Sequence, residues 1–91
     1  MPDPLSTQII VATAPWCASC AGYKPQVKTF AEQHGYQYRE VNIEADPAFA
    51  AKHGVQSLPT TLIMRGGVIK DRFSGAVNIG MLATRVNTLG A

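Results

Sequence analysis

The chain has 91 residues, of which 46% are hydrophobic, and this length fits one small domain with a modest core. Eight basic and six acidic residues give a net charge of +2, and the basic residues are scattered, so no patch for nucleic acid is formed. No apolar run is long enough to span a membrane. We therefore expect a single domain, 1–91, which is a monomer and binds neither nucleic acid nor a membrane.

The first part of the chain predicts a loose arm, a buried strand and a helix. Two prolines in residues 1–5 indicate the arm. The short run of apolar, β-branched residues within 8–13 is typical of a strand that is covered on both faces. A helix should begin at the cysteines and end near Gly35, with a kink at Pro25. The residues on its inward face share helical spacing and are Tyr23, Val27, Phe30, Ala31 and His34.

A second strand and a short helix are expected next. Residues 36–43 alternate in the manner of a strand. Asp46 can cap the following helix at its amino end, and Pro47 suits the first helical position. Gly54 should end this helix.

The last part of the chain predicts a β-hairpin and a helix. Residues 61–65 and 68–73 are separated by two glycines, 66–67, which permit a tight turn. The final helix should begin at about Asn78. Its buried stripe is predicted to be Ile79, Leu82, Val86 and Leu89.

Both cysteines of the chain lie in one motif, Cys17-Ala18-Ser19-Cys20, between the first strand and the first helix. The first N–H groups of a helix lack intrahelical partners, and the helix dipole adds partial positive charge there. Both effects favour a thiolate, so Cys17 should titrate below a free cysteine, whereas Cys20 should be more buried. This asymmetry suits a two-step exchange. Cys17 attacks a substrate disulfide, and Cys20 then attacks Cys17 and releases the reduced substrate.

Three other interpretations of this motif need weighing. Zinc requires four ligands, and His34 and His53, which alone could join the cysteines, lack finger-like spacing. A purely structural disulfide is a poor interpretation, because a disulfide that closes so short a loop restrains little of the unfolded chain and so adds little stability. A chance C-x-x-C is the main alternative. The strand before the motif, the helix after it and the segment Leu58-Pro59-Thr60 favour the redox site.

With these residues in view, the sequence resembles the thioredoxin family. The matching features keep the family's order and are Ala14-Pro15-Trp16-Cys17 with Cys20, Pro25, Asn42-Ile43, Gly54-Val55, Leu58-Pro59-Thr60, Gly67 and Gly75. The resemblance implies an α/β thioredoxin-like fold in a minimal β-α-β-α-β-β-α form, with a central four-stranded mixed sheet flanked by helices. The strand and helix that begin full-length thioredoxins are missing. The resemblance also implies a disulfide reductase with no cofactor beyond the redox-active disulfide Cys17–Cys20, in which Cys17 is the nucleophile and Cys20 the resolving thiol.

The same resemblance suggests where a substrate lies. It implies a cis peptide bond before Pro59, placed against the cysteines. The backbone of Leu58 would then face an incoming chain, which could pair with it as an added strand. Gly75 should lie beside the cysteines and leave room for substrate backbone. Together with Trp16, these residues form the expected substrate-binding set.

The chain departs from the family near the resolving cysteine. Thioredoxins usually carry a buried aspartate where this sequence has Val11, and a lysine where it has Glu40. If Glu40 pointed at Cys20 from a dry site, the loss of solvation would suit it as a proton acceptor. The alternative is a solvated carboxylate at the end of a strand, near Arg39. Between the cysteines, Ser19 could donate a weak hydrogen bond to the sulfur of Cys17.

The expected function is therefore a small thiol–disulfide oxidoreductase that donates electrons to disulfide-containing proteins. Its reductant should be either a thioredoxin-reductase-like enzyme or glutathione. A glutaredoxin-like, glutathione-dependent reductase is one alternative, although the site lacks the Cys-Pro-Tyr-Cys form typical there. A redox-inactive binding module of the same fold is another. The amino terminus shows no secretory signal, so we expect a cytoplasmic location.

Overall fold

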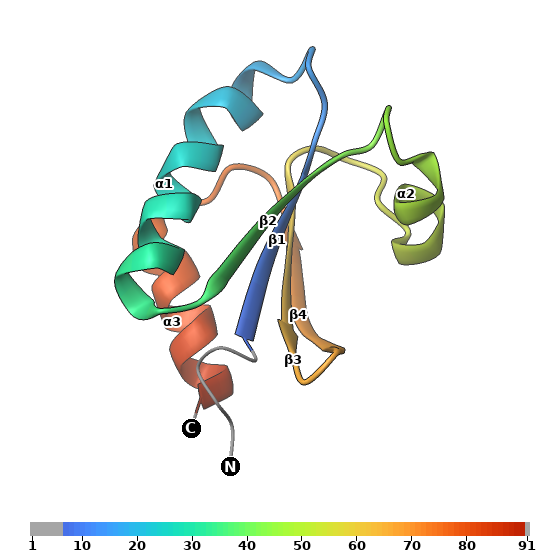
Figure 1. The fold of residues 1–91 in the computed structure, drawn as a ribbon. Coiled ribbons are helices and arrows are strands. Elements are labelled where there is room, and N and C mark those ends of the chain that lie inside the picture. Colours follow the sequence, from blue (N-terminus) through green and yellow to red (C-terminus); the bar gives the residue numbers. More distant parts are fainter. Residues whose placement is uncertain (1–6, 91) are drawn as a thin grey trace.

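The computed structural model describes residues 7–90, which form one sheet and three helices in the predicted order (Figure 1). The strands are β1 (Thr7–Thr13), β2 (Gln37–Asn42), β3 (Thr60–Arg65) and β4 (Val68–Ser74). They lie in the order β2-β1-β3-β4. β1 runs parallel to β2, and β3 is antiparallel to both β1 and β4, which confirms the mixed sheet. The arm predicted for residues 1–5 lies outside the described residues.

Two helices, α1 (Ala18–His34) and α3 (Ile79–Gly90), cover one face of the sheet (Figure 1). Their inward side chains and those of the strands form one buried cluster, which consists of Ile9, Val11, Tyr23, Val27, Phe30, Ala31, Ile63, Phe73, Leu82 and Val86. Burial of each large apolar side chain contributes about 1.5–3 kcal/mol to stability. This cluster therefore holds α1, and with it the cysteines, in a fixed place over the sheet.

The inward face predicted for α1 is buried, with one exception. His34 is exposed at the end of the helix, where its ring packs against Phe30 at a centroid distance of 4.4 Å. α1 continues as one helix through Pro25 and ends at Gly35, whose φ of +71° suits glycine. In α3 the predicted stripe is confirmed at Leu82 and Val86, and Ile79 is half-buried. The side chain of Leu89 lies outside the described residues.

The opposite face of the sheet carries the short helix α2 (Pro47–His53) (Figure 1). Its predicted caps are confirmed, because the Asp46 carboxylate accepts the N–H of Phe49 at 3.1 Å and Gly54 ends the helix with φ +63°. A smaller buried cluster lies beneath it and consists of Ile10, Ala12, Val41, Phe49 and Leu62. The sheet is therefore covered by two helices on one face and by one short helix on the other.

Local signals also set the hairpin and the start of α3. Gly66 and Gly67 turn between β3 and β4 with φ of +59° and +80°, as the two-residue turn requires. Asn78 caps α3, since its Oδ1 accepts the N–H of Met81 at 2.8 Å.

Among the described residues, no helix combines the length and the apolar character needed to cross a membrane.

An ion pair joins β4 to α3, and we expect it to make the stability of the fold depend on pH. Arg85 donates from Nε and Nη2 to the two carboxylate oxygens of Asp71, both at 2.6 Å. These bonds lower the pKa of Asp71 below its ordinary value of 3.8. Because the pKa of Asp71 is lower in the folded state than in the unfolded state, the ion pair stabilises the fold when the pH lies above the unfolded-state pKa. This stabilisation is lost as the pH falls through the folded-state pKa.

Asp71→Asn is therefore expected to reduce the free energy of unfolding at pH 7, and the deficit should shrink below about pH 4. Urea unfolding of both proteins across this pH range measures the difference. A deficit that stays constant with pH would show that the ion pair adds no pH-dependent stability.

Candidate active site

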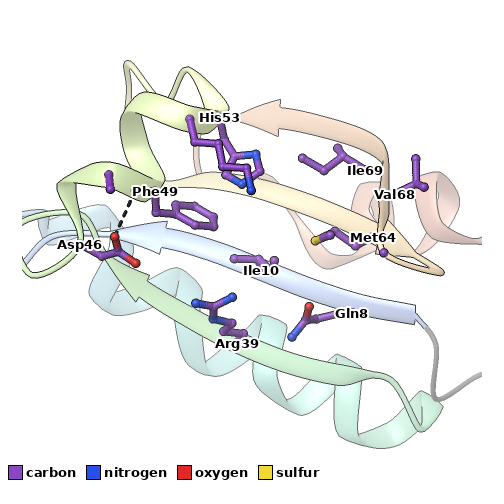
Figure 2. A pocket seen from close by; sticks show the side chains of 12 residues that line it. Gln8, Ile10, Arg39, Asp46, Phe49, His53, Met64, Val68 and Ile69 are labelled. Carbon is purple, nitrogen blue, oxygen red and sulfur yellow. Dashed lines mark hydrogen bonds between the residues drawn. The ribbon is translucent and has the colours of Figure 1, made fainter.

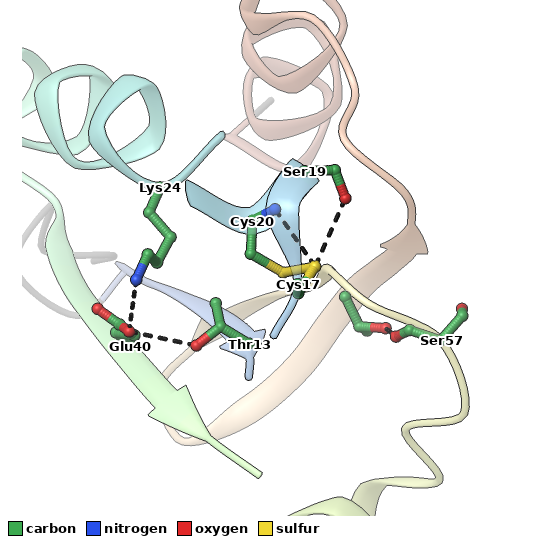
Figure 3. Close-up of a disulfide and its surroundings, with 8 residues drawn as sticks. Thr13, Cys17, Ser19, Cys20, Lys24, Glu40 and Ser57 are labelled. Carbon is green, nitrogen blue, oxygen red and sulfur yellow. Dashed lines mark hydrogen bonds and ion pairs between the residues drawn. A yellow bond between two sulfur atoms is a disulfide. The ribbon is translucent and has the colours of Figure 1, made fainter. Parts of the chain in front are cut away.

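The two cysteines lie at the amino end of α1 and form a disulfide, with their Cα atoms 5.3 Å apart (Figure 3). Cys17 is the N-cap residue, with extended backbone, and its Sγ accepts the N–H of Cys20 at 3.3 Å. The N–H of Cys17 itself donates to the carbonyl of Ala14 at 3.1 Å, which closes the turn between β1 and the helix. The sequence prediction that a helix begins at the cysteines is confirmed.

The two sulfurs differ in their surroundings. Cys17 is 9% exposed, whereas Cys20 is 1% exposed and belongs to the inward side of α1. The hydroxyl of Ser19 lies 3.5 Å from Sγ of Cys17. The more exposed cysteine is therefore the one whose sulfur has a helical N–H and a hydroxyl directed at it, and the deeper burial of Cys20 agrees with the sequence expectation.

The segment that carries Leu58 and Pro59 lies at the same end of the sheet. Thr60 pairs with Ala12 on β1, so Pro59 lies level with the end of β1 that leads to Cys17. The Leu58–Pro59 peptide bond is cis, as the family resemblance implies.

Gly75 is joined to this segment. Its N–H donates to the carbonyl of Pro59 at 2.8 Å, and its φ of +93° suits glycine. A Cβ at Gly75 would meet no other atom within 4 Å, so the space beside it is open. In the view of Figure 3 the disulfide lies between Ser57, which precedes Leu58, and Glu40.

Trp16 is the most exposed large apolar residue among those described, at 66%. Its indole Nε1 donates to the carboxylate of Glu44 at 3.0 Å. The N–H of Glu44 in turn donates to Oδ1 of Asn42, which fixes the start of the loop after β2. Glu44 was missed at the sequence level, because nothing in its spacing links it to a residue 28 positions earlier.

Glu40 lies in a different environment from the dry site considered above. Its side chain is 41% exposed, and its Oε2 accepts hydrogen bonds from Lys24 Nζ at 2.9 Å and from Thr13 Oγ1 at 3.2 Å (Figure 3). The carboxylate is therefore solvated, as the alternative expectation held. Its partner is Lys24 rather than Arg39, because alternation along β2 turns Arg39 to the opposite face, over the ring of Phe49.

Val11 lies on β1 beneath α1 and is completely buried. Its cross-strand neighbour Thr61 forms a 2.7 Å hydroxyl–hydroxyl hydrogen bond with Tyr23, one turn after Cys20 on α1. Burial raises the pKa of Tyr23, and burial together with the nearby charge of Glu40 raises the pKa of Tyr38 to about 12. Both phenols therefore stay neutral at physiological pH. The sequence predicted Tyr23 as a core residue but not its hydrogen bond.

The zinc alternative gains nothing from the geometry. The rings of His34 and His53 pack against Phe30 and Phe49, at the ends of different helices. Within residues 7–90, no three side chains of the metal-binding types His, Cys, Asp and Glu lie together.

Comparison with known proteins identifies the family. The family model for Thioredoxin matches residues 4–88. The chain belongs to the thioredoxin family. Thioredoxin from Pyropia yezoensis is 37% identical over 76 residues, which cover 81% of this chain and 71% of the relative. Thioredoxin 1 from Synechococcus elongatus is 37% identical over 78 residues, which cover 84% of this chain and 70% of the relative.

Solved thioredoxin structures show the same fold. The crystal structure of Fasciola hepatica thioredoxin matches with a TM-score of 0.81 and 27% identity, and covers 89% of this chain and 79% of that one. A thioredoxin mutant from Halobacterium salinarum matches with a TM-score of 0.86 at 23% identity, and covers 92% of this chain and 74% of that one. Family membership and the Cys17–Cys20 disulfide together make the protein a thiol–disulfide oxidoreductase. Thioredoxins act on disulfide-containing substrates and are re-reduced by a reductase, and this chain shares that general scheme.

Proposed function

We propose that Cys17 is the attacking thiolate and Cys20 the resolving thiol in the reduction of protein disulfides. The observation that carries this assignment is the helical N–H directed at Sγ of Cys17, the more exposed of the two cysteines. In the reduced protein the same N–H and the helix dipole stabilise negative charge on Cys17.

The exchange proceeds in two balanced steps. The Cys17 thiolate attacks one sulfur of the substrate disulfide, that S–S bond breaks, and the other substrate sulfur leaves and takes up a proton. Cys20 then loses its proton and attacks the sulfur of Cys17, and the second substrate sulfur leaves as a thiol. The cysteine pair loses two electrons and two protons, which the substrate gains.

Alkylation kinetics of Cys17 test this assignment. In a Cys20→Ser variant, in which Cys17 is the only thiol, the rate of reaction with iodoacetamide should rise through a midpoint below about 8.5, the value of a free cysteine. The matched Cys17→Ser variant, with only Cys20, should react more slowly at every pH, because its sulfur is buried. A midpoint for Cys17 at or above that of a free cysteine would refute the proposal.

The substrate should bind along Trp16, Leu58, Pro59 and Gly75. Pro59 and Gly75 are joined by a hydrogen bond at the end of β1 that leads to Cys17, and the space beside Gly75 is open. We propose that substrate backbone pairs with Leu58 there. The exposed indole of Trp16, which directly precedes Cys17, also contacts the substrate.

Glu40, although it is solvated and paired with Lys24 rather than held in a dry site, is proposed as the proton acceptor for Cys20. The support is that its carboxylate reaches the buried hydroxyl of Thr13, the last residue of β1. Glu40→Gln keeps the shape of the side chain and removes the charge, so resolution of a preformed mixed disulfide should slow, with a changed pH profile. Glu32→Gln, which alters an exposed carboxylate near the carboxyl end of α1, away from the cysteines, is the matched control and should leave resolution unchanged. An unaltered rate across pH would remove Glu40 from the mechanism.

A thioredoxin-reductase-like enzyme is the reductant that family membership favours. The glutaredoxin-like alternative requires glutathione instead. Supplying the oxidised protein with NADPH and thioredoxin reductase, or with glutathione, and quantifying free thiols distinguishes the two. Faster reduction by glutathione would support the alternative.

A further inference from the structure

A groove of about 720 Å³ lies on the α2 face of the sheet, outside the disulfide site (Figure 2). It begins at Phe49 and His53 of α2 and extends over the strands toward Gln8 and the β3–β4 hairpin. Its floor is apolar and is formed by Ile10, Phe49, Met64 and Ile69, with Val68 at the hairpin end.

Part of this floor is exposed because α2 has seven residues, whereas the other face is covered by helices of 17 and 12 residues. Met64 and Ile69, which pair across β3 and β4, are only half-buried, and Val68 is 55% exposed. An exposed apolar face on a sheet is a feature of interaction sites.

The charged side chains around the groove are mainly positive. Arg39 and Lys52 line it, and Arg39 lies with its guanidinium 5.8 Å from the centre of the Phe49 ring. Arg72 lies at the carboxyl end of α2, where it donates to the carbonyls of His53 and Gly54. Asp46 is the acidic residue among the lining residues, and its carboxylate is occupied as the cap of α2. A partner that carries acidic side chains would complement this rim.

The shape of the site favours a helix over an extended peptide. The backbone groups of the sheet are paired along the strands, so a ligand on this face gains apolar burial but no ladder hydrogen bonds. A strand laid on such a face would leave its own N–H and C=O groups unpaired, whereas a helix satisfies them internally. Four strands span about 14 Å between the outer strand axes, which accommodates one helix of about 10–12 Å diameter.

We propose that this groove docks an amphipathic helix of a partner protein, with an apolar stripe against Met64, Ile69 and Val68 and acidic flanks facing Arg39 and Lys52. Met64, which the apolar stripe would cover, pairs with Gln8 on β1, five residues before Thr13 and about 16 Å from the end of β1 that leads to the disulfide. A helix docked at this hairpin end of the groove therefore leaves Cys17 accessible, and its binding does not depend on the exchange chemistry proposed above.

The test uses the oxidised 91-residue chain labelled with ¹⁵N and a capped, stapled helical peptide of about 12 residues, roughly 18 Å long. Leucines spaced three and four residues apart form its apolar stripe, and glutamates fill the other positions. Titration is expected to shift the amide resonances of Gln8, Met64, Ile69 and Lys52. The resonances of Trp16 and Gly75 should stay in place, and the rate of insulin reduction should be unchanged.

Charge variants supply the matched comparison. Lys52→Glu is expected to weaken peptide binding roughly fivefold, whereas Lys28→Glu, an exposed lysine of α1 on the other face, should not. A second peptide in which lysine replaces every glutamate should bind more weakly than the first to the unaltered protein.

Several results would overturn the proposal. They are the absence of binding, shifts centred on Trp16 and Gly75, and equal affinity for the acidic and basic peptides. If the amide resonances of the groove residues shift with rising protein concentration in the absence of peptide, the groove would be assigned to a second copy of the chain. The same shifts on deletion of residues 1–6 would assign it to the chain's own amino-terminal segment.

Discussion

Cys17→Ser is expected to lower the reduction of insulin disulfides by at least roughly a thousandfold, because a hydroxyl at this position cannot form the nucleophile. Cys20→Ser should also stop turnover, but for a different reason. Its Cys17 still attacks, and no second thiol releases the substrate, so a mixed disulfide accumulates. Mass spectrometry of the protein after incubation with an oxidised substrate peptide should detect this adduct with Cys20→Ser and not with Cys17→Ser.

Ser19→Ala is the matched control for this pair. It alters the residue between the cysteines and removes the hydroxyl 3.5 Å from the sulfur of Cys17, but it keeps both thiols. It should retain most of the activity, since the helical N–H of Cys20 still points at that sulfur. Full activity in Cys17→Ser would contradict the mechanism. A biological role that survives in Cys17→Ser without reductase activity would favour the binding-module alternative.

Val11→Asp is expected to lower stability at pH 7 by about 3 kcal/mol more than Val11→Asn does, a large part of the 5–15 kcal/mol typical of a domain. Val11 is completely buried in the cluster beneath α1, and its neighbours Tyr23 and Thr61 already hydrogen bond to each other. A carboxylate placed there loses its hydration and gains no opposite charge from these hydroxyls.

The pH dependence of the free energy of unfolding separates the cost of the buried charge from the cost of losing the valine side chain. Burial should raise the pKa of the introduced carboxyl, so the folded state binds its proton more tightly than the unfolded state does. Stability then falls as the pH rises above about 4, the unfolded value, and the cost is complete once the pH exceeds the folded value. Urea unfolding at several pH values should show the two variants converging near pH 4 and separating toward pH 7. Equal stabilities at pH 7 would contradict the expected cost of the charge.

The elements of the fold could be predicted closely because their signals are local. Asp46 and Asn78 cap the two helices that follow them, and both caps are present. Gly54 and the glycine pair 66–67 adopt the positive φ angles that their positions require. Each of these depends on a few neighbouring residues, so the pattern in the chain is sufficient.

The predictions for the site were less complete where they depended on contacts between distant elements. The solvent exposure of Glu40 and its contact with Lys24 depend on how α1 crosses β2, which no spacing reveals. Glu44 contacts Trp16 across 28 positions, and Tyr23 contacts Thr61 across 38. Strand alternation explains why Glu40 and Arg39 lie on opposite faces of the sheet, but it could not name the partner of either residue.

The sequence by itself determined the order of the elements, their caps and turns, and the placing of Cys17 and Cys20 at the start of a helix, since all of these arise within a few residues. Only the tertiary structure decided that the hydroxyls of Tyr23 and Thr61 form a buried pair beneath α1, that Glu40 is solvated, and that a positively rimmed apolar groove is left beside α2. The physical reason is that burial and pairing depend on which surfaces meet when the sheet and helices pack. That packing brings together residues whose separation along the chain carries no signal.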